Sequence, residues 1–263
     1  MEILDKPFGL AGERKACALV CLAFYTAFFG LLSLLLNNAP PDQPELRAWW
    51  ACFAALGACY GISFFALGAG WFWARWVAMG LGYSGVTLAF WTIVTQRTIE
   101  PVMAFYGITH GIIVLFLQGQ KLVEEFDAKP EWRKRLGLDD KAVLRVRQSV
   151  TRAATSLPTL IVIALAPREG SEGLWLAALG VFGIVGLLRL RTAGVLALLG
   201  AGLLLPWPML AHTHASGAIA SFMPPFMSYG LLHLMGLTAA GLLVSASVPF
   251  LRPIARFLAG RAA

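Results

Sequence analysis

The amino-acid sequence predicts an all-α protein, a polytopic transmembrane bundle of eight helices built as two parallel four-helix repeats. Its composition is the first reason: 58% of the 263 residues are hydrophobic, only 13% are charged, and the mean hydropathy is +0.71. The second reason is that apolar runs of about 20 residues, the length that crosses a ~30 Å hydrocarbon core, alternate with short polar stretches. The third is a motif that occurs twice, 123 positions apart. These features exclude an ordinary soluble domain and a transmembrane barrel.

The first repeat, residues 1–119, is expected to contain four membrane helices. The long apolar run 16–36 exceeds the apolar core of a signal peptide, so we interpret it as a retained first helix. The other three are expected over residues 48–69, 76–95 and 101–118. Tryptophans at the start of the second and third helices suit the membrane–water interface.

Residues 120–156 are expected to form a basic cytoplasmic linker between the repeats. Val143, Val146 and Val150 share one helical face, so we expect an amphipathic helix that lies on the membrane surface. A solvated linker is the alternative interpretation.

The second repeat occupies residues 157–263. Its four helices are expected over 150–166, 174–188, 193–210 and 224–248, the first of them overlapping the end of the linker.

The distribution of positive charge predicts the orientation. With eight crossings, 18 of the 21 lysines and arginines fall on the side of the amino terminus. Such an asymmetry is typical of cytoplasmic loops, so we expect both termini in the cytoplasm and the protein in the inner (cytoplasmic) membrane. The same bias accounts for the net charge of +7 without nucleic acid as a partner.

The duplicated motif reads Pro-x4-Tyr-Gly-x-x-His. It occupies Pro101, Tyr106, Gly107 and His110 in the fourth helix, and Pro224, Tyr229, Gly230 and His233 in the eighth. Each histidine follows its proline by nine residues, which places it roughly 13 Å along the helix and near the membrane midplane. Tyrosine, glycine and histidine share one face, and small residues beside polar ones are typical of helix–helix contacts in lipid.

From this pattern we predict a central site between the repeats, formed by Tyr106, His110, Tyr229 and His233. An ionisable residue inside the membrane indicates a functional site unless it is simply hydrogen-bonded in the bundle. No other charged residue lies firmly within a predicted helix, which favours transport or binding of a small neutral or lipid-like molecule. Membrane lipid is therefore the expected partner.

Two further hypotheses remain open. The histidines could be structural, in an accessory or scaffold subunit that binds other membrane subunits. Alternatively, His110 and His233 could ligate a haem iron or another metal, as could His212 and His214 on the preceding loop. The sequence contains no nucleophile elbow, zinc-protease motif or phosphate loop, so it does not point to an enzyme.

Overall fold

The protein is helical throughout its described part. A computed structural model describes residues 11–127 except 41 and 43, and then residues 133–134, 137, 139–166, 172–207 and 229–259. In chain order the helices are α2 (Ala11–Asn37), α3 (Pro44–Ala48), α4 (Trp50–Gly68), α5 (Ala74–Gln96), α6 (Pro101–Leu117), α7 (Gln120–Asp127), α9 (Asp140–Leu165), α10 (Glu172–Leu188), α11 (Thr192–Leu204) and α13 (Tyr229–Ala259).

Several of these helices could cross a membrane. Four of the described helices are long and apolar enough: Gly12–Asn37, Leu46–Gly68, Ala74–Gln96 and Gly230–Arg256. A fifth span results if α6 and α7, which meet at a bend of 73°, form one broken crossing. The apolar helices α10 and α11 have 17 and 13 residues. At 1.5 Å per residue they reach only about 26 and 20 Å, less than the thickness of the hydrocarbon core.

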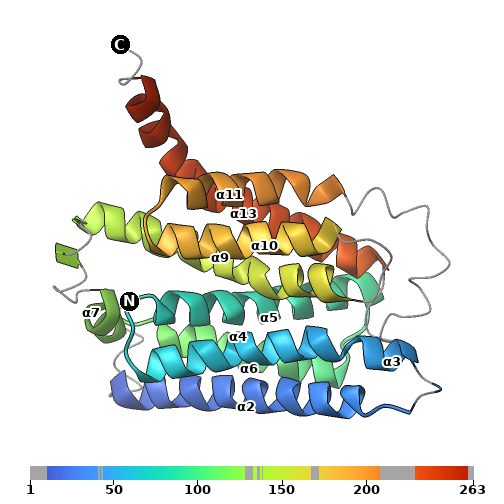
Figure 1. Ribbon diagram of the computed structural model, residues 1–263. Coiled ribbons are helices and arrows are strands. Elements are labelled where there is room, and N and C mark those ends of the chain that lie inside the picture. Colours follow the sequence, from blue (N-terminus) through green and yellow to red (C-terminus); the bar gives the residue numbers. More distant parts are fainter. Residues whose placement is uncertain are drawn as a thin grey trace.

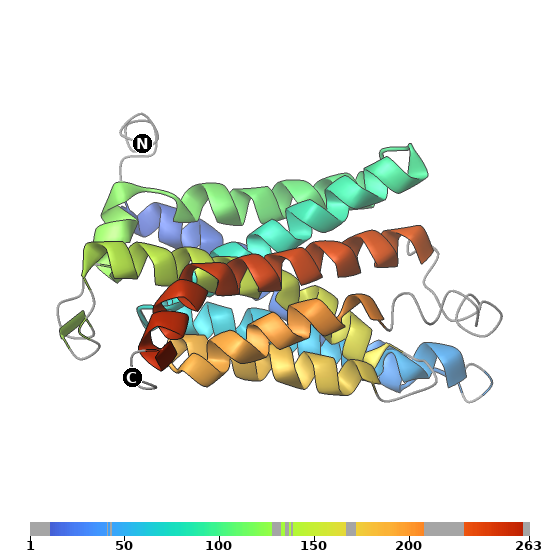
Figure 2. The same cartoon turned by 90° about the horizontal axis from the view of Figure 1, so that it is seen from above.

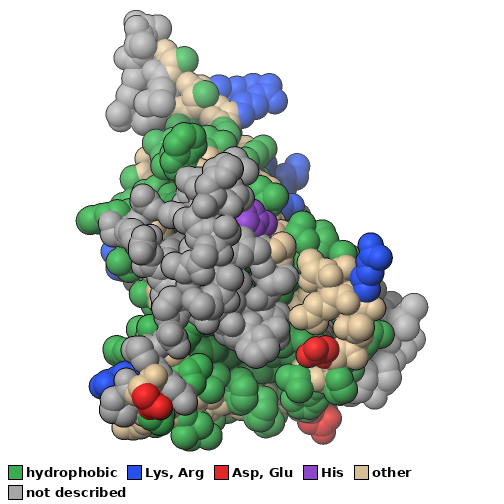
Figure 3. Space-filling view, turned by 90° about the vertical axis from the view of Figure 1, so that its right-hand side faces the viewer, with side chains coloured by type: hydrophobic (Ala, Val, Ile, Leu, Met, Phe, Trp, Pro, Cys, Tyr) green, Lys and Arg blue, Asp and Glu red, His purple; other side chains and the backbone are tan. Residues whose placement is uncertain are grey.

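The outer surface of the bundle is also typical of a membrane protein. Large apolar side chains point outward along most of the long helices, among them Phe24 and Leu34 on α2, Phe65 on α4 and Phe90 on α5. Figure 3 shows hydrophobic side chains over much of the described surface at one end, with few charged ones between them. Such an extensive apolar surface would be unstable in water, so the fold is that of a multi-pass membrane protein.

The long helices form two four-helix bundles with the same ring of neighbours. In the first, α2 packs against α4, α4 against α5, α5 against α6, and α6 against α2. In the second, α9, α10, α11 and α13 make the equivalent ring. The two bundles join through α5, which packs against α9 and α13 (Figures 1 and 2). The start of α2, α7 and the end of α13 lie at one end of the molecule, opposite α3 (Figure 1).

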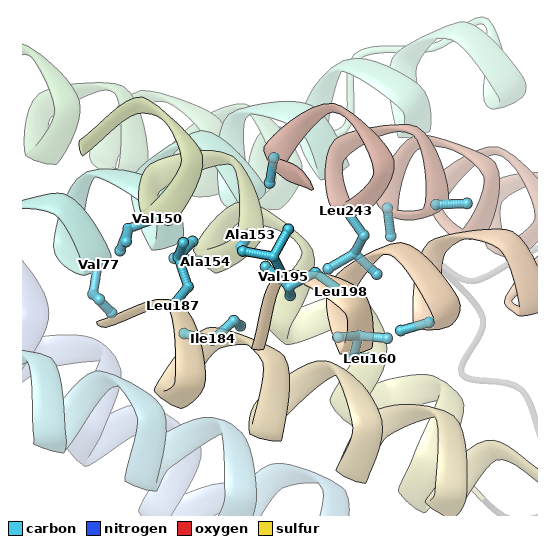
Figure 4. Close-up of a cluster of buried hydrophobic side chains, with 14 of the residues drawn as sticks. Val77, Val150, Ala153, Ala154, Leu160, Ile184, Leu187, Val195, Leu198 and Leu243 are labelled. Atoms are coloured by element: carbon cyan, nitrogen blue, oxygen red, sulfur yellow. The ribbon is translucent and has the colours of Figure 1, made fainter. Parts of the chain in front are cut away.

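Each bundle has its own buried apolar cluster. Leu22, Tyr60 and Leu81 belong to the first. The second is shown in Figure 4 and contains Leu160, Leu198 and Leu243, together with other side chains from α5, α9, α10, α11 and α13. The two clusters meet at the joint between the bundles, because the second one includes Trp76 and Val77 of α5, and Ile161, Val162 and Leu165 of α9 pack against the first.

Helix α9 runs without interruption through the predicted linker into the predicted fifth helix. Asp139 begins it as an N-cap, since its side chain accepts a hydrogen bond of 2.6 Å from the amide of Ala142. Val143, Val146 and Val150 do share one face, and all three are buried in the second core. The apolar face of this basic segment therefore packs against protein, so one continuous helix forms where a surface helix and a separate span were expected.

The joint between the halves depends on a glycine. A Cβ atom on Gly80 of α5 would lie 2.5 Å from the Cβ of Ala154 and 2.8 Å from the carbonyl oxygen of Thr151, both on α9. Such distances are shorter than any normal contact. The absence of a side chain at Gly80 therefore allows the two backbones to approach, as at other small-residue interfaces in membranes.

We expect Gly80→Ala to lower the free energy of unfolding in detergent by about 1–3 kcal/mol, because the added methyl group forces α5 and α9 apart. Gly111→Ala on α6 is the matched control, since its Cβ would meet its nearest neighbour at 3.9 Å. Thermal and denaturant unfolding of both variants measure the difference. Equal stability of the two variants would contradict the close packing described for Gly80.

Candidate functional site

His110 lies at the centre of the first bundle. Its side chain is completely buried, and both of its ring nitrogens are hydrogen-bonded. Nδ1 lies 2.8 Å from the backbone carbonyl oxygen of Tyr106, to which only an N–H can donate. Nε2 lies 2.7 Å from the hydroxyl of Tyr60 and therefore accepts its hydrogen bond. The imidazole is thus neutral, with its proton on Nδ1.

Aromatic rings from three helices enclose this imidazole. The ring centroids of Tyr25 on α2 and Tyr106 on α6 lie 4.2 and 4.1 Å from that of His110, and Tyr60 on α4 approaches edge-on at 5.7 Å. Gly85 of α5 completes the enclosure, because a Cβ there would lie only 2.1 Å from Cγ of His110. All four helices of the first half therefore meet at His110.

The other predicted site residues have different surroundings. His233 is half-buried on α13, which packs against α9 and α11 of the second half. Tyr229 is the first residue of α13, and its side chain lies outside the described residues, as do His212 and His214. The hydrogen bonds and ring contacts described for His110 all come from the first half. The structure thus brings together Tyr106 and His110, and adds Tyr25 and Tyr60.

The surroundings of His110 do not fit an axial haem ligand, because Tyr60 and the Tyr106 carbonyl already engage both nitrogens. Within the described part of the chain, no three histidine, cysteine or acidic side chains come together as a metal site.

An apolar cavity of about 220 Å³ lies between the two halves, and Tyr106 is one of its walls. The walls come from both bundles, and among the described lining residues the polar groups are the hydroxyls of Ser84, Tyr106 and Thr159, the indole N–H of Trp49 and the thiol of Cys52. The lining residues are Phe28, Phe29, Leu32, Trp49, Cys52, Phe53, Leu56, Ser84, Leu88, Val102, Met103, Tyr106, Pro158, Thr159, Val162, Leu231, Leu232 and Met235. We call this space the interbundle cavity.

A buried ionic cluster that the sequence did not predict lies at the amino-terminal end of α5. The carboxylate of Asp127 on α7 lies 3.3 Å from Nη1 of Arg75 on α5 and 2.9 Å from Nη1 of Arg147 on α9. It also accepts a hydrogen bond of 2.7 Å from Nε1 of Trp76. Arg75 in turn donates to the carbonyl oxygen of Leu117 at the end of α6, at 2.8 Å. Asp127 of α7 therefore connects α5 of the first half with α9 of the second half.

Beside this cluster is a second, larger pocket, which we call the arginine pocket. It has a volume of about 520 Å³ and lies between α5, α7, α9 and α13. Its walls are rich in guanidinium, amide and hydroxyl groups, in contrast to the rest of the bundle. The lining residues are Arg75, Met79, Tyr83, Thr87, Gln118, Gly119, Val123, Arg147, Gln148, Thr151, Arg152, Thr155, Thr238 and Leu242.

A periodic signal for this pocket is present in the sequence. Positions 75, 79, 83 and 87 are four residues apart, as are 147, 151 and 155, so each set lines one helical face. The signal is visible only once α5 and α9 are known to be neighbours.

Comparison with models of known protein families, with curated proteins and with solved structures gives no significant match. The function therefore has to be argued from the two cavities and the residues around them.

Tyr60→Phe is expected to lower the free energy of unfolding by about 1–2 kcal/mol, because it leaves the buried Nε2 of His110 without a donor. Tyr83→Phe is the control, since Tyr83 is 37% exposed and, within the described residues, its hydroxyl accepts a hydrogen bond from the side-chain amide of Gln118. Unfolding of both variants in the same detergent gives the comparison. Equal losses in the free energy of unfolding would show that the buried hydrogen bond to His110 stabilises the protein no more than the exposed bond of Tyr83 does.

Asp127→Asn should be far more disruptive, at about 3–5 kcal/mol, because it leaves the buried guanidinium of Arg75 without its counter-ion. The side chains of Arg75 and Asp127 are only 4% and 5% exposed. Glu125→Gln on the same helix removes the partially exposed pair with Lys15 and is expected to cost about 0–1 kcal/mol. The midpoints of denaturant unfolding distinguish the two effects, and similar midpoints would argue against Asp127 as a structural link.

Proposed function

We propose that this protein binds a small, apolar, lipid-like molecule in the interbundle cavity, between its two four-helix halves. The observation that carries the proposal is the cavity itself, which has a volume of about 220 Å³ and almost entirely apolar walls. Ligand sites in helical bundles form between helices and are mostly apolar with a few polar groups, as here.

The volume sets the size of the ligand. An apolar cavity of about 150 Å³ in another protein stays free of water and accommodates benzene. The interbundle cavity is somewhat larger, so it suits one ring or a short segment of an acyl chain. Only a few of the described lining residues carry polar side-chain groups, chiefly the hydroxyls of Ser84, Tyr106 and Thr159, so the ligand carries few polar atoms.

The route into the cavity leads from the bilayer. Phe28 of α2 and Val102 of α6 are wall residues, and they are also 46% and 70% exposed on the outer, lipid-facing surface. A hydrophobic molecule dissolved in the membrane can therefore reach the cavity between these helices without crossing water. This favours a membrane lipid, or a molecule carried in lipid, as the natural ligand.

Tyr106 and His110 have different roles in this proposal. Tyr106 lines the cavity, whereas His110 lies behind it and holds its backbone through the 2.8 Å hydrogen bond from Nδ1. His110 is thus a positioning residue rather than a contact residue. The opposite wall includes three residues of α13 that are close to His233 in the sequence, namely Leu231, Leu232 and Met235. Ligand binding therefore involves the two motif-bearing helices, with unequal contributions from their histidines.

A neutral photoactivatable alkyl probe tests this proposal. In membranes, we expect it to label peptides that contain wall residues of α6, α9 and α13 above the general level of lipid-facing surfaces. Leu232→Trp fills the cavity from α13 and should reduce this labelling about tenfold, because the indole occupies the volume of the ligand.

Leu237→Trp is the matched control, since Leu237 lies on the same helix, is 53% exposed and does not line the cavity. Its labelling should equal that of the unmodified protein. Uniform labelling of all lipid-facing segments, unchanged by Leu232→Trp, would refute the proposal.

A further inference from the structure

We infer that the arginine pocket is a second binding site, specific for the phosphate group of an anionic ligand. It shares no lining residue with the interbundle cavity, so the inference does not depend on the function proposed above. Its volume of about 520 Å³ falls within the range of about 300–1,000 Å³ that is usual for small-molecule sites.

The charge at this pocket is unbalanced. Three arginines line it, and none of the described residues that line it is acidic. The nearby carboxylate of Asp127 pairs with Arg75 and Arg147 and can neutralise only one of the three cations. A net charge of +2 therefore remains at the pocket, and it favours the binding of an anion there.

Two of the guanidinium groups have donors to spare. Within the described residues, Arg147 uses only Nη1, toward Asp127, and Arg152 uses only Nη1, toward the carbonyl oxygen of Ser245 at 3.3 Å. Nε and Nη2 of both side chains remain available to a ligand. These two groups form the planar fork that binds two oxygen atoms of a phosphate or carboxylate at once.

Phosphate fits these donors better than a carboxylate. Free phosphate carries up to two negative charges, which match the net charge of the pocket, and the phosphodiester of a lipid carries one. Either has at least two unesterified oxygens, enough to reach both forks at the same time. The side-chain amides of Gln118 and Gln148 supply further donors at the rim.

The shape of the pocket allows two sources of this phosphate. The lining of α5 extends from Arg75 to Thr87, which is about 18 Å along the helix at 1.5 Å per residue. Along this length Met79 and Leu242 add apolar surface, and Tyr83 is 37% exposed at the side of the bundle. A lipid could place its phosphate at the arginines and its chains toward Tyr83. Free phosphate would use the arginine end alone. Basic pockets between membrane helices are known to bind anionic head groups.

Titration of the full-length protein in detergent tests the site and distinguishes the two sources. The probes are dioctanoyl phosphatidylglycerol, dioctanoyl phosphatidylcholine and inorganic phosphate, with native mass spectrometry for the lipids and calorimetry for phosphate. Arg152→Gln should weaken binding of the anionic probe about tenfold or more, because it removes one charge and one fork. Phosphatidylcholine, whose choline cancels the phosphate charge, should bind at least about tenfold more weakly than phosphatidylglycerol.

Arg145→Gln is the matched control on the same helix, since Arg145 is exposed and does not line the pocket. It should change binding less than twofold. Arg152→Lys, which keeps the charge without the fork, should bind with intermediate affinity and guards against a loss caused by misfolding. If only phosphatidylglycerol binds in an Arg152-dependent way, the ligand is a lipid head group. If only inorganic phosphate does so, the ligand is soluble. Equal affinities of the Arg152→Gln and Arg145→Gln proteins for every probe would overturn the inference. Equal binding of the two lipids would also overturn it, unless inorganic phosphate binds in an Arg152-dependent way.

Discussion

The structure depends on the rule that polar groups inside a lipid-facing bundle must find partners within the protein. Asp127 shows the rule most clearly, because its carboxylate joins Arg75, Arg147 and Trp76 and so links α5, α7 and α9. The cluster lies where the two halves meet, next to the short helix that follows the bend after α6. This ionic cluster, the close contact at Gly80 and the apolar packing of α5 against α9 together hold the halves to each other.

The repeated Tyr-Gly-His motif is used differently in the two halves. In α6, the missing side chain of Gly107 allows α5 to approach, since a Cβ there would lie 2.7 Å from the Cβ of Ala89. For the corresponding Gly230, no atom of the described residues lies within 4 Å of such a Cβ. His110 has aromatic neighbours on several sides, whereas His233 is half-buried. The same four motif residues therefore have different environments in the two halves, because the neighbouring helices decide what surrounds each imidazole.

Sequence reasoning was most accurate where the structure depends on local patterns. Hydropathy and an N-terminal proline predicted a helix over 101–118, and the structure has Pro101–Leu117. Residues 76–95 were predicted as a helix, and the structure has Ala74–Gln96. The burial of the first part of α9 was not predicted, because this charged segment was expected to lie on the membrane surface or in solvent. Whether that charge is solvated or buried depends on Asp127, which lies 20 residues before Arg147 and 52 after Arg75.

The candidate site was predictable to the same limited extent. Tyr106 and His110 were recognised because the motif is repeated, whereas Tyr25 and Tyr60 appeared to be ordinary members of apolar runs. They approach His110 only after three other helices have packed around α6. The arginine pocket was missed for the same reason, since its walls come from helices that are distant in the chain.

Helix α5 connects the two proposed sites. Ser84 and Leu88 line the interbundle cavity, whereas Tyr83 and Thr87, one position earlier in each case, line the arginine pocket. Neighbouring positions on a helix point about 100° apart, so the two sites lie on different faces of the same helix. Helix α13 is shared in the same way, through Leu232 and Thr238. Any movement of α5 against α9 therefore changes both spaces at once. A ligand that favours one arrangement of the halves in either space must then alter affinity in the other, because such coupling is reciprocal.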